Sequence, residues 1–357
     1  MVERNEKKRQ KKILRRRWRR GAWGHFFAFI FKLILTLVIA LVLGLHCMFC
    51  GPSPTIRDIL TMSVTESSAL KFLPYLFMTP DTIEDIFKRS AVVEPDEGID
   101  TSLITIKAQH SVSTVNPEDT ENSEEAEKKE EPIALYPVKG LTYCGYMMIV
   151  QDPSRVFVGA CDDSYYNARG MRIDELAAKY GAIGGINANG FEDPSGSGNG
   201  GKPIGTVVSN GNIMKVDPNC TAAGFDQNNI LHVGKFTKKQ LEELGIRDAA
   251  AWGPALIVNG EAAKVSDTQT GLNPRSVIGQ RADGAELMLF IDGRHANSLG
   301  ASYSDVIDIM LQYGAVNACN LDGGYSAVMY LNGERVSDIL TLDQSRRLPS
   351  AFLIRGE

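Results

Sequence analysis

The stretch Asn320-Leu321-Asp322-Gly323-Gly324-Tyr325-Ser326 ends an apolar run that begins at Ala315. A carboxylate, two glycines and a hydroxyl therefore follow at the point where a hydrophobic strand ends. Glycine lets the backbone turn tightly or approach a ligand closely, at a cost in chain entropy. A similar ending lies thirty residues earlier, where the apolar run 287–291 is followed by Asp292-Gly293-Arg294. These two strand ends predict the place of a functional site.

A helix is expected between the two strands, because residues 304–313 carry four apolar side chains on one face and stop before Gly314. Strand, helix and strand make a β-α-β unit, whose strands run parallel with a right-handed crossover. Asp292 and Asp322 are therefore expected at the same edge of one sheet. Ligands of open α/β sheets bind beyond the carboxyl ends of the strands.

The surrounding sequence predicts a domain rich in strands. Asn-Gly turns between apolar runs predict hairpins at 207–214, 256–261 and 328–336, and Asp283-Gly284 predicts a fourth. Further helices are expected at 172–180 and 237–244, each ending at a glycine. We therefore expect an α+β fold: a single globular domain with a mixed, curved β-sheet, hairpins and crossover helices.

A third apolar strand, 182–186, also ends in polar groups beside glycine, at Asn187-Ala188-Asn189-Gly190. Three such endings in one domain favour a site over chance turns, although Asn189 alone is typical of a left-handed turn. The Gly-, Ser- and Asn-rich loop that follows is either a mobile tip or a lid. Ser326 lacks the second glycine of a nucleophile elbow, which argues against a nucleophilic serine.

The N-terminus predicts a membrane anchor. Of the 38 basic and 43 acidic residues of the chain, eleven and two lie in the first twenty positions, which leaves 27 basic against 41 acidic. Residues 26–45 are almost wholly apolar and span about 30 Å as a helix, the thickness of a bilayer core. The basic block is expected to stay cytoplasmic, which places the C-terminal domain outside the cell. A cleaved signal peptide is the alternative, but no small-x-small site follows the apolar run.

Composition divides the chain into five parts. We expect a basic cytoplasmic tail over 1–25, a transmembrane helix over 26–45, a helical juxtamembrane stalk over 46–93, an acidic disordered linker over 94–132 and a globular domain over 133–357. In the stalk, helices are expected at 55–60 and 67–77, with another starting near Thr79-Pro80. The linker is too polar to offset its ordering entropy. A domain this acidic is a poor binder of nucleic acid.

Histidine and cysteine limit the possible chemistry. Only His232 and His295 fall in the globular domain, so a Ser-His-Asp hydrolase or a zinc site must use one of them. His295 is the better candidate, because it lies close to Asp292 in sequence. The six cysteines define no disulfide framework, since the four in the globular domain allow three pairings. Cys319 is expected to be a small buried hydrophobe.

The ordered motifs resemble the phosphodiester glycosidase domain family, which includes the mannose-6-phosphate uncovering enzyme and bacterial exopolysaccharide-related proteins. The resemblance covers residues 136–355 and rests on Ile186-Asn187, Gly190-Phe191, Pro203–Gly211, Asn273–Gly279, Asp292-Gly293-Arg294 and Asn320–Ser326. The family usually has a third glycine before the serine, where this chain has Tyr325. It usually has a second glycine after the first asparagine, where this chain has Ala188-Asn189.

The resemblance implies hydrolysis of a sugar-1-phosphodiester at its glycosidic bond, in cell-envelope polysaccharide metabolism and without a cofactor. Asp292 and Asp322 would stabilise an oxocarbenium-like centre or activate water, and Arg275 would bind the phosphate. Asn187 would hydrogen-bond the sugar or orient the water. The substrate-binding residues implied in addition are Arg294, Gly323, Gly324, Ser326, His295, Glu192 and Thr206.

Two other functional classes stay open at this point. One is a divalent-metal phosphodiesterase, with Asp292, Asp322 and Asn187 as oxygen ligands to Ca²⁺ or Mg²⁺. The other is a non-catalytic protein that binds or assembles cell-wall polymer on the same fold. The sugar, the retaining or inverting outcome, the separate roles of the two aspartates and the oligomeric state also stay open. Wall teichoic acids and phosphodiester-linked capsular glycans are the polymers considered.

Overall fold

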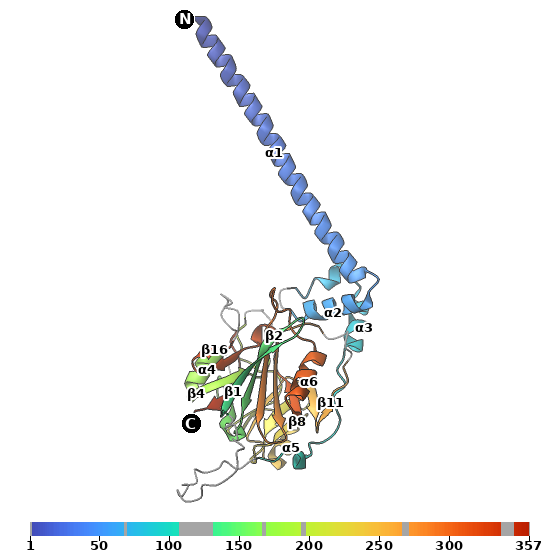
Figure 1. Ribbon diagram of the computed structural model, residues 1–357, viewed down its shortest axis with the longest axis vertical. Coiled ribbons are helices and arrows are strands. Elements are labelled where there is room, and N and C mark those ends of the chain that lie inside the picture. The colour runs from blue at the N-terminus through green and yellow to red at the C-terminus, as the bar shows by residue number, and fades with distance from the viewer. Residues whose placement is uncertain are drawn as a thin grey trace, which may run out of the picture.

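The computed structural model describes residues 2–67, 70–106, 131–165, 169–193, 198–265, 271–336 and 346–356. Helix α1 (Val2–Cys50) projects from the remainder of the molecule, and α2 (Pro54–Thr65) and α3 (Pro80–Arg89) lie where it meets the strand-rich part (Figure 1). One helix among these residues is long and apolar enough to cross a membrane, over His25–Cys50. The expected transmembrane segment is thus helical, and it extends to the end of α1.

The stalk helices begin where their sequences provide caps. The hydroxyl of Ser53 accepts a hydrogen bond from the N–H of Ile56, and that of Thr79 accepts one from Thr82; proline follows each cap. The helix expected over 67–77 is wrong as far as that segment is described, since only the short 3₁₀ turn η1 (Pro74–Leu76) forms there. Pro74 has no N–H to continue a helix, and it restricts the residue before it.

Residues 94–106 lie against the globular domain. The carboxylate of Glu94 accepts hydrogen bonds from the Thr221 hydroxyl and the Ala255 N–H, and Ile104 is buried. The short 3₁₀ turn η2 (Thr101–Leu103) belongs to this segment. The linker expected over 94–132 therefore starts later than residue 94, and its part over 107–130 lies outside the described residues.

The strands form three sheets. The first runs in the order β1 (Ile133–Lys139), β2 (Cys144–Val150), β13 (Glu286–Ile291), β12 (Arg275–Arg281), β14 (Ala315–Asn320), β10 (Ala255–Val258) and β11 (Glu261–Ala262). The second runs β16 (Glu334–Arg335), β15 (Met329–Leu331), β4 (Ala182–Asn187), β17 (Ser350–Arg355) and β3 (Val156–Ala160). The third runs β6 (Asn212–Lys215), β5 (Val207–Ser209), β9 (Asp248–Ala251), β7 (Ala222–Phe225) and β8 (Leu231–Gly234).

The α+β class is confirmed, but the single mixed sheet is not. Every strand pairing among the described residues is antiparallel. The four expected hairpins are present, and both residues of each Asn-Gly turn have positive φ. The expected helices form as α4 (Ile173–Tyr180), α5 (Lys238–Glu243) and α6 (Tyr303–Gln312). The domain also contains the 3₁₀ turns η3 (Pro153–Arg155) and η4 (Gly324–Ser326).

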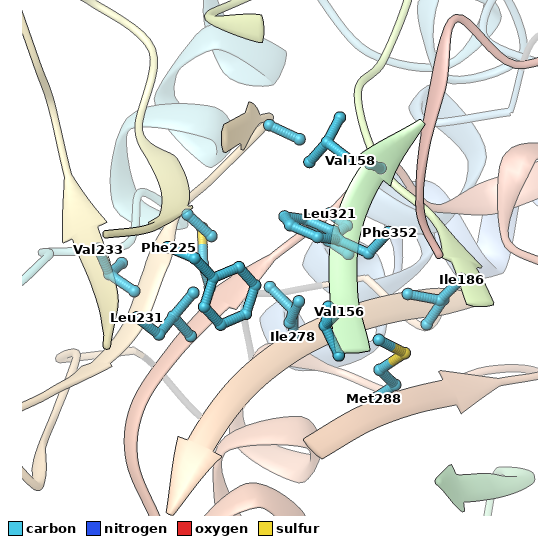
Figure 2. Close-up of a cluster of buried hydrophobic side chains, with 14 of the residues drawn as sticks. Val156, Val158, Ile186, Phe225, Leu231, Val233, Ile278, Met288, Leu321 and Phe352 are labelled. Carbon is cyan, nitrogen blue, oxygen red and sulfur yellow. The ribbon is translucent and has the colours of Figure 1, made fainter. Parts of the chain in front are cut away.

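One hydrophobic core joins the three sheets. Figure 2 shows Met288 and Ile278 of the first sheet, Ile186 and Phe352 of the second, and Phe225 of the third in one cluster. The opposite face of the first sheet packs against α6. Side chains of β13 alternate between the two faces, and both are buried, so every residue of the strand after Glu286 is apolar. All six cysteines are free thiols, and Cys319 is a buried residue of this core, as expected.

Candidate functional site

The two Asp-Gly endings meet at one edge of the first sheet. Strands β13 and β14 are both antiparallel to β12, which lies between them, so they run in the same direction. Asp292 and Asp322 therefore emerge at the same edge, as expected, with their backbones two strand spacings or about 10 Å apart. The expected β-α-β unit needs one correction: β12 separates its two strands. The hairpin expected at Asp283-Gly284 accounts for the pairing of this strand with β13, but nothing in the sequence indicated that it also pairs with β14.

Asp322 has an environment suited to proton transfer. Burial raises the pKa of its carboxyl to about 7, although the hydroxyl of Ser326, the charge of Arg346 and the N–H of Gly323 act in the opposite direction. Its backbone is held on both sides, since its N–H donates to the carbonyl of Ala188 and its carbonyl accepts from the amide of Asn187. A carboxyl with a pKa near 7 exchanges its proton close to neutral pH.

Asn187 supports the site from beneath. It is fully buried, and its side-chain oxygen accepts hydrogen bonds from the Ser276 hydroxyl at 2.7 Å and the Val328 N–H at 3.0 Å. Its amide nitrogen donates to the Asp322 carbonyl at 2.6 Å. This asparagine thus joins β4 of the second sheet to β12 and the end of β14. These bonds make it a positioning residue, rather than the sugar or water ligand that was expected.

Asp292 and His295 form a second polar pair at the same edge. The carboxylate of Asp292 accepts the N–H of Gly293 at 2.8 Å and lies 3.5 Å from Nε2 of His295. The backbone carbonyl of Asp292 accepts a hydrogen bond from the Ser298 hydroxyl at 2.6 Å, which fixes the turn after β13. His295, which is close to Asp292 in sequence, thus also lies beside its carboxylate in the structure.

Arg275 is buried and held in one orientation. Its Nε donates to the carbonyl of Ala301 and its Nη2 to the carbonyl of Gly271, while the guanidinium lies 4.2 Å from the ring centroid of Tyr303. Its Nη1 lies 3.5 Å from a carboxylate oxygen of Glu66. The guanidinium is thus rigid, and one of its nitrogens faces an anion.

The anion at Arg275 comes from the stalk. Glu66, just beyond α2, accepts a 2.6 Å hydrogen bond from Nδ2 of Asn273, and its backbone carbonyl lies 3.4 Å from Nη2 of Arg294. The neighbouring Ser63 hydroxyl accepts the N–H of Leu272. Asn273, Arg275 and Arg294 therefore form a seat for a negatively charged group, which we call the anion seat, and a carboxylate of the same chain occupies it.

Two arginines flank the exposed ring of Tyr325. The guanidinium of Arg294 lies 4.8 Å and that of Arg346 lies 6.0 Å from its centroid. Arg294 has a left-handed backbone, with φ at 64°, and its Nη2 donates to Oδ1 of Asn273. Burial lowers the pKa of Arg294. Tyr325 thus stands between cations that lie beside Asp322 and the anion seat.

The N–H groups of Gly323 and Gly324, in the turn that follows β14, both have hydrogen-bond partners. The N–H of Gly324 donates to the carbonyl of Pro274, and that of Gly323 bonds to the carboxyl of Asp322. Gly323 and Gly324 were expected to bind substrate, and in this conformation their N–H groups are already bonded within the protein. A side chain on Gly323 would meet the Pro274 carbonyl oxygen at 2.7 Å, so glycine is needed there for close approach of two backbones.

The other expected binding residues have local partners. Glu192 pairs with Lys202 at 2.6 Å, and that interaction lowers the pKa of Glu192. Thr206 is buried, and its hydroxyl accepts the N–H of Asp217. Asn189 donates to three backbone carbonyls, so it is a buried structural residue and not a turn residue. The structure does not bring these three into the contacts that join Asp322 and the anion seat.

The metal-ion alternative was expected to use oxygens of Asp292, Asp322 and Asn187. Among the described residues, no group of three or more His, Cys, Asp or Glu side chains is placed to hold a metal ion. The oxygen of Asn187, one of the three ligands expected in that case, already accepts two hydrogen bonds.

Sequence reasoning missed Glu66, Asn273 and Arg346. Asn273 could have been identified from the sequence, because it lies two residues before Arg275 in the motif Asn273–Gly279. Glu66 and Arg346 gave no signal, since each lies among ordinary polar residues far from the strand ends. Arg346 also lies 3.7 Å from the carboxylate of Asp193, at the end of the Gly-rich loop segment.

Comparison with known proteins bears on the family and the fold of the globular domain. The phosphodiester glycosidase family model matches residues 180–355. A prophage-derived uncharacterized protein of Bacillus subtilis, YomE, is 33% identical over 99 residues, which is 27% of this chain and only 15% of that protein. The fold resembles the zebrafish N-acetylglucosamine-1-phosphodiester alpha-N-acetylglucosaminidase catalytic domain auto-inhibited by pro-peptide, with a TM-score of 0.53 at 18% identity over 64% of this chain and 85% of that chain.

A hypothetical protein from Synechocystis is also similar, with a TM-score of 0.46 at 16% identity over 62% of this chain and 61% of that chain. The family match spans both strand ends that carry Asp292 and Asp322, together with Asn187 and Arg275. Residues 180–355 of the globular domain therefore match the phosphodiester glycosidase family.

Proposed function

We propose that this chain is a membrane-anchored hydrolase that cleaves the glycosidic bond of sugar-1-phosphodiesters outside the cell, in cell-envelope polysaccharide metabolism. The observation that carries the proposal is the placement of Asp322, with its pKa raised to about 7, at one sheet edge with Asp292 and the anion seat. Hydrolysis of such a bond needs a carboxyl group at the sugar and cations at the phosphate. Both are present at this edge.

Asp322 is assigned the proton transfer. Water attacks the anomeric carbon, the bond from that carbon to the phosphate oxygen breaks, and the phosphate leaves as a monoester. One proton of the water must be removed, and a neighbouring carboxylate accepts it. A carboxyl group poised near pH 7 suits that exchange, whereas the carboxylate of Asp292, beside His295, is suited to stabilising positive charge at the sugar ring.

The cations are assigned to the phosphate. Arg275 cannot turn away from the site, because its Nε and Nη2 are bonded to backbone carbonyls. Its remaining nitrogen, together with the amide of Asn273 and the guanidinium of Arg294, faces the position that Glu66 now fills. Fixed donors stabilise developing charge without reorganising, which is why a buried guanidinium suits a leaving phosphate.

The test uses the full chain in lipid nanodiscs, because the stalk contributes to the site. A panel of hexose and N-acetylhexosamine 1-phosphodiesters is incubated in water enriched in ¹⁸O, and the products are analysed by mass spectrometry. Glycosidic cleavage places the label on the free sugar, whereas a metal phosphodiesterase places it on phosphate and releases sugar 1-phosphate. Full activity in an Asp292→Ala, Asp322→Ala double variant, or label found on phosphate, would sink the proposal.

A further inference from the structure

The segment after Glu66 exposes several large apolar side chains. Within residues 70–77, here called the interface loop, Leu70, Phe72, Tyr75 and Leu76 have exposed fractions of 47%, 56%, 53% and 67%. Contiguous apolar surface of this kind marks an interaction site with a protein or a membrane. The position of the interface loop beside α1 indicates whether its partner is a protein or a membrane.

The interface loop packs against the last turns of α1. The ring of Phe77 stacks on that of Phe49, with centroids 5.3 Å apart and planes inclined by 12°, and it lies 6.4 Å from the ring of His46. The thiol of Cys50 donates to the carbonyl of Phe77. These residues belong to the C-terminal end of the apolar stretch His25–Cys50. The loop is therefore level with the end of that stretch.

We propose that the interface loop is a membrane-docking surface, seated in the outer leaflet that α1 crosses, and that the substrate is a sugar-1-phosphodiester whose alcohol is a lipid. A helix that spans the bilayer brings any segment packed on its end to the headgroup region. Aromatic side chains such as Tyr75 are enriched at that level, with an apolar ring and a polar tip. The lipid leaflet then covers the side chains that the chain itself leaves exposed.

The second half of the inference rests on the proposed function and on how the loop joins the site. Only three residues separate Glu66 in the anion seat from Leu70, a chain length of at most about 14 Å. The backbone of Gly271 packs against Ser63, so the stalk and the strand that carries Arg275 are in direct contact. Figure 1 shows α2 at the end of the domain nearest to α1. The anion seat therefore lies close to the plane in which lipid phosphates occur.

Two exposed leucines also lie beside the turn that carries His295. Leu299, four residues after His295, is 54% exposed, and its N–H donates to the carbonyl of Thr142, next to the fully exposed Leu141. A site that binds only a charged, water-soluble sugar phosphate has no use for exposed leucines. They fit an alcohol moiety that carries hydrocarbon.

The position of the loop is tested with the full chain in nanodiscs. Trifluoromethyl-phenylalanine is placed at position 72, or at position 244 as a control, because exposed Leu244 ends α5 at the end of the domain away from α1 (Figure 1). We expect a lipid-borne gadolinium agent to broaden the fluorine signal at position 72, and a soluble gadolinium chelate to broaden only that at position 244. Equal broadening of both positions by the soluble chelate would overturn the docking surface.

The substrate class is tested by activity in the same nanodiscs. A Phe72→Ser, Leu76→Ser variant is expected to lose about fivefold or more in rate on a lipid-linked sugar-1-phosphodiester, and to keep the unmodified rate on a water-soluble analogue. Equal rates for variant and unmodified chain on the lipid-linked substrate would contradict the inference. If the unmodified chain hydrolyses neither substrate, the proposed function fails, whereas the fluorine result still decides the docking surface.

Discussion

The side-chain amide of Asn273 donates a 2.6 Å hydrogen bond to the carboxylate of Glu66, a residue 207 positions earlier in the chain. The bond ties the stalk that follows α1 to the sheet edge that carries both aspartates. Arg275 lies 3.5 Å from the same carboxylate. A negatively charged group of the protein thus occupies the seat that the proposed mechanism assigns to the phosphate.

Replacing Glu66 with glutamine is expected to tighten the binding of an external phosphate group. The glutamine side chain keeps the size of glutamate but loses the charge that competes with phosphate for Arg275. Because a partly exposed ion pair is worth up to about 1 kcal/mol, the affinity for phosphate should rise by up to roughly fivefold. Isothermal titration of inorganic phosphate and the KM for a sugar-1-phosphodiester both measure the effect. Glu84→Gln on α3 is the matched control, because Glu84 pairs with Lys88 on the surface of the stalk. Unchanged affinity in Glu66→Gln would show that an external anion binds elsewhere.

Much of the fold could be predicted from local patterns. The Asn-Gly turns and the glycine after α4 act over a few residues, so each was correctly predicted. The insertion of β12 between β13 and β14 is a long-range event, and its residues Val277 and Ile278 fit any buried strand. Periodicity shows which face of a strand is buried, but it does not show which strand lies next to it.

Replacing Asp322 with asparagine is expected to abolish activity and to stabilise the protein at alkaline pH. The raised pKa means that the folded state prefers the protonated carboxyl. The stabilisation from that preference is complete below the unfolded pKa of about 4 and is lost as pH rises through about 7. Asparagine avoids this loss, so the melting temperature of Asp322→Asn relative to the unmodified chain should increase between pH 5 and pH 8. The rate should fall by about a hundredfold or more. A melting difference that does not change with pH would contradict the assignment.

The candidate site was only half predictable. Asp292, Asp322 and Arg275 stand at strand ends or in motifs, where sequence shows both their chemistry and their place. The role of Asn187 could not be inferred, because an asparagine at a strand end has the same pattern whether it contacts a ligand or supports a neighbour. Its bonds to Ser276 and Val328 come from parts of the chain far away in sequence.

Replacing Arg346 with glutamine is expected to shift the pH dependence of the rate. The charge of Arg346 lowers the pKa of Asp322, so its removal raises that pKa, and the limb of the profile governed by Asp322 should move to higher pH. Arg335→Gln is the control, because Arg335 lies on the β16 hairpin strand beside Asp174 and should leave the profile unchanged. A uniform loss of rate at all pH values would indicate that Arg346 binds substrate without tuning Asp322.

Tyr325, which stands where the family usually has glycine, is expected to hold Arg294 in place for the phosphate. Its ring lies 4.8 Å from that guanidinium, a contact worth about 0.5–1 kcal/mol at an exposed position. Tyr325→Ala should therefore raise the KM for a sugar-1-phosphodiester about two- to fivefold with little change in kcat, because the ring acts on binding and not on proton transfer. Tyr325→Phe retains the ring and should keep most of the affinity. Equal KM values for the alanine and phenylalanine variants would show that the hydroxyl, which also interacts with Arg294, makes the contribution instead.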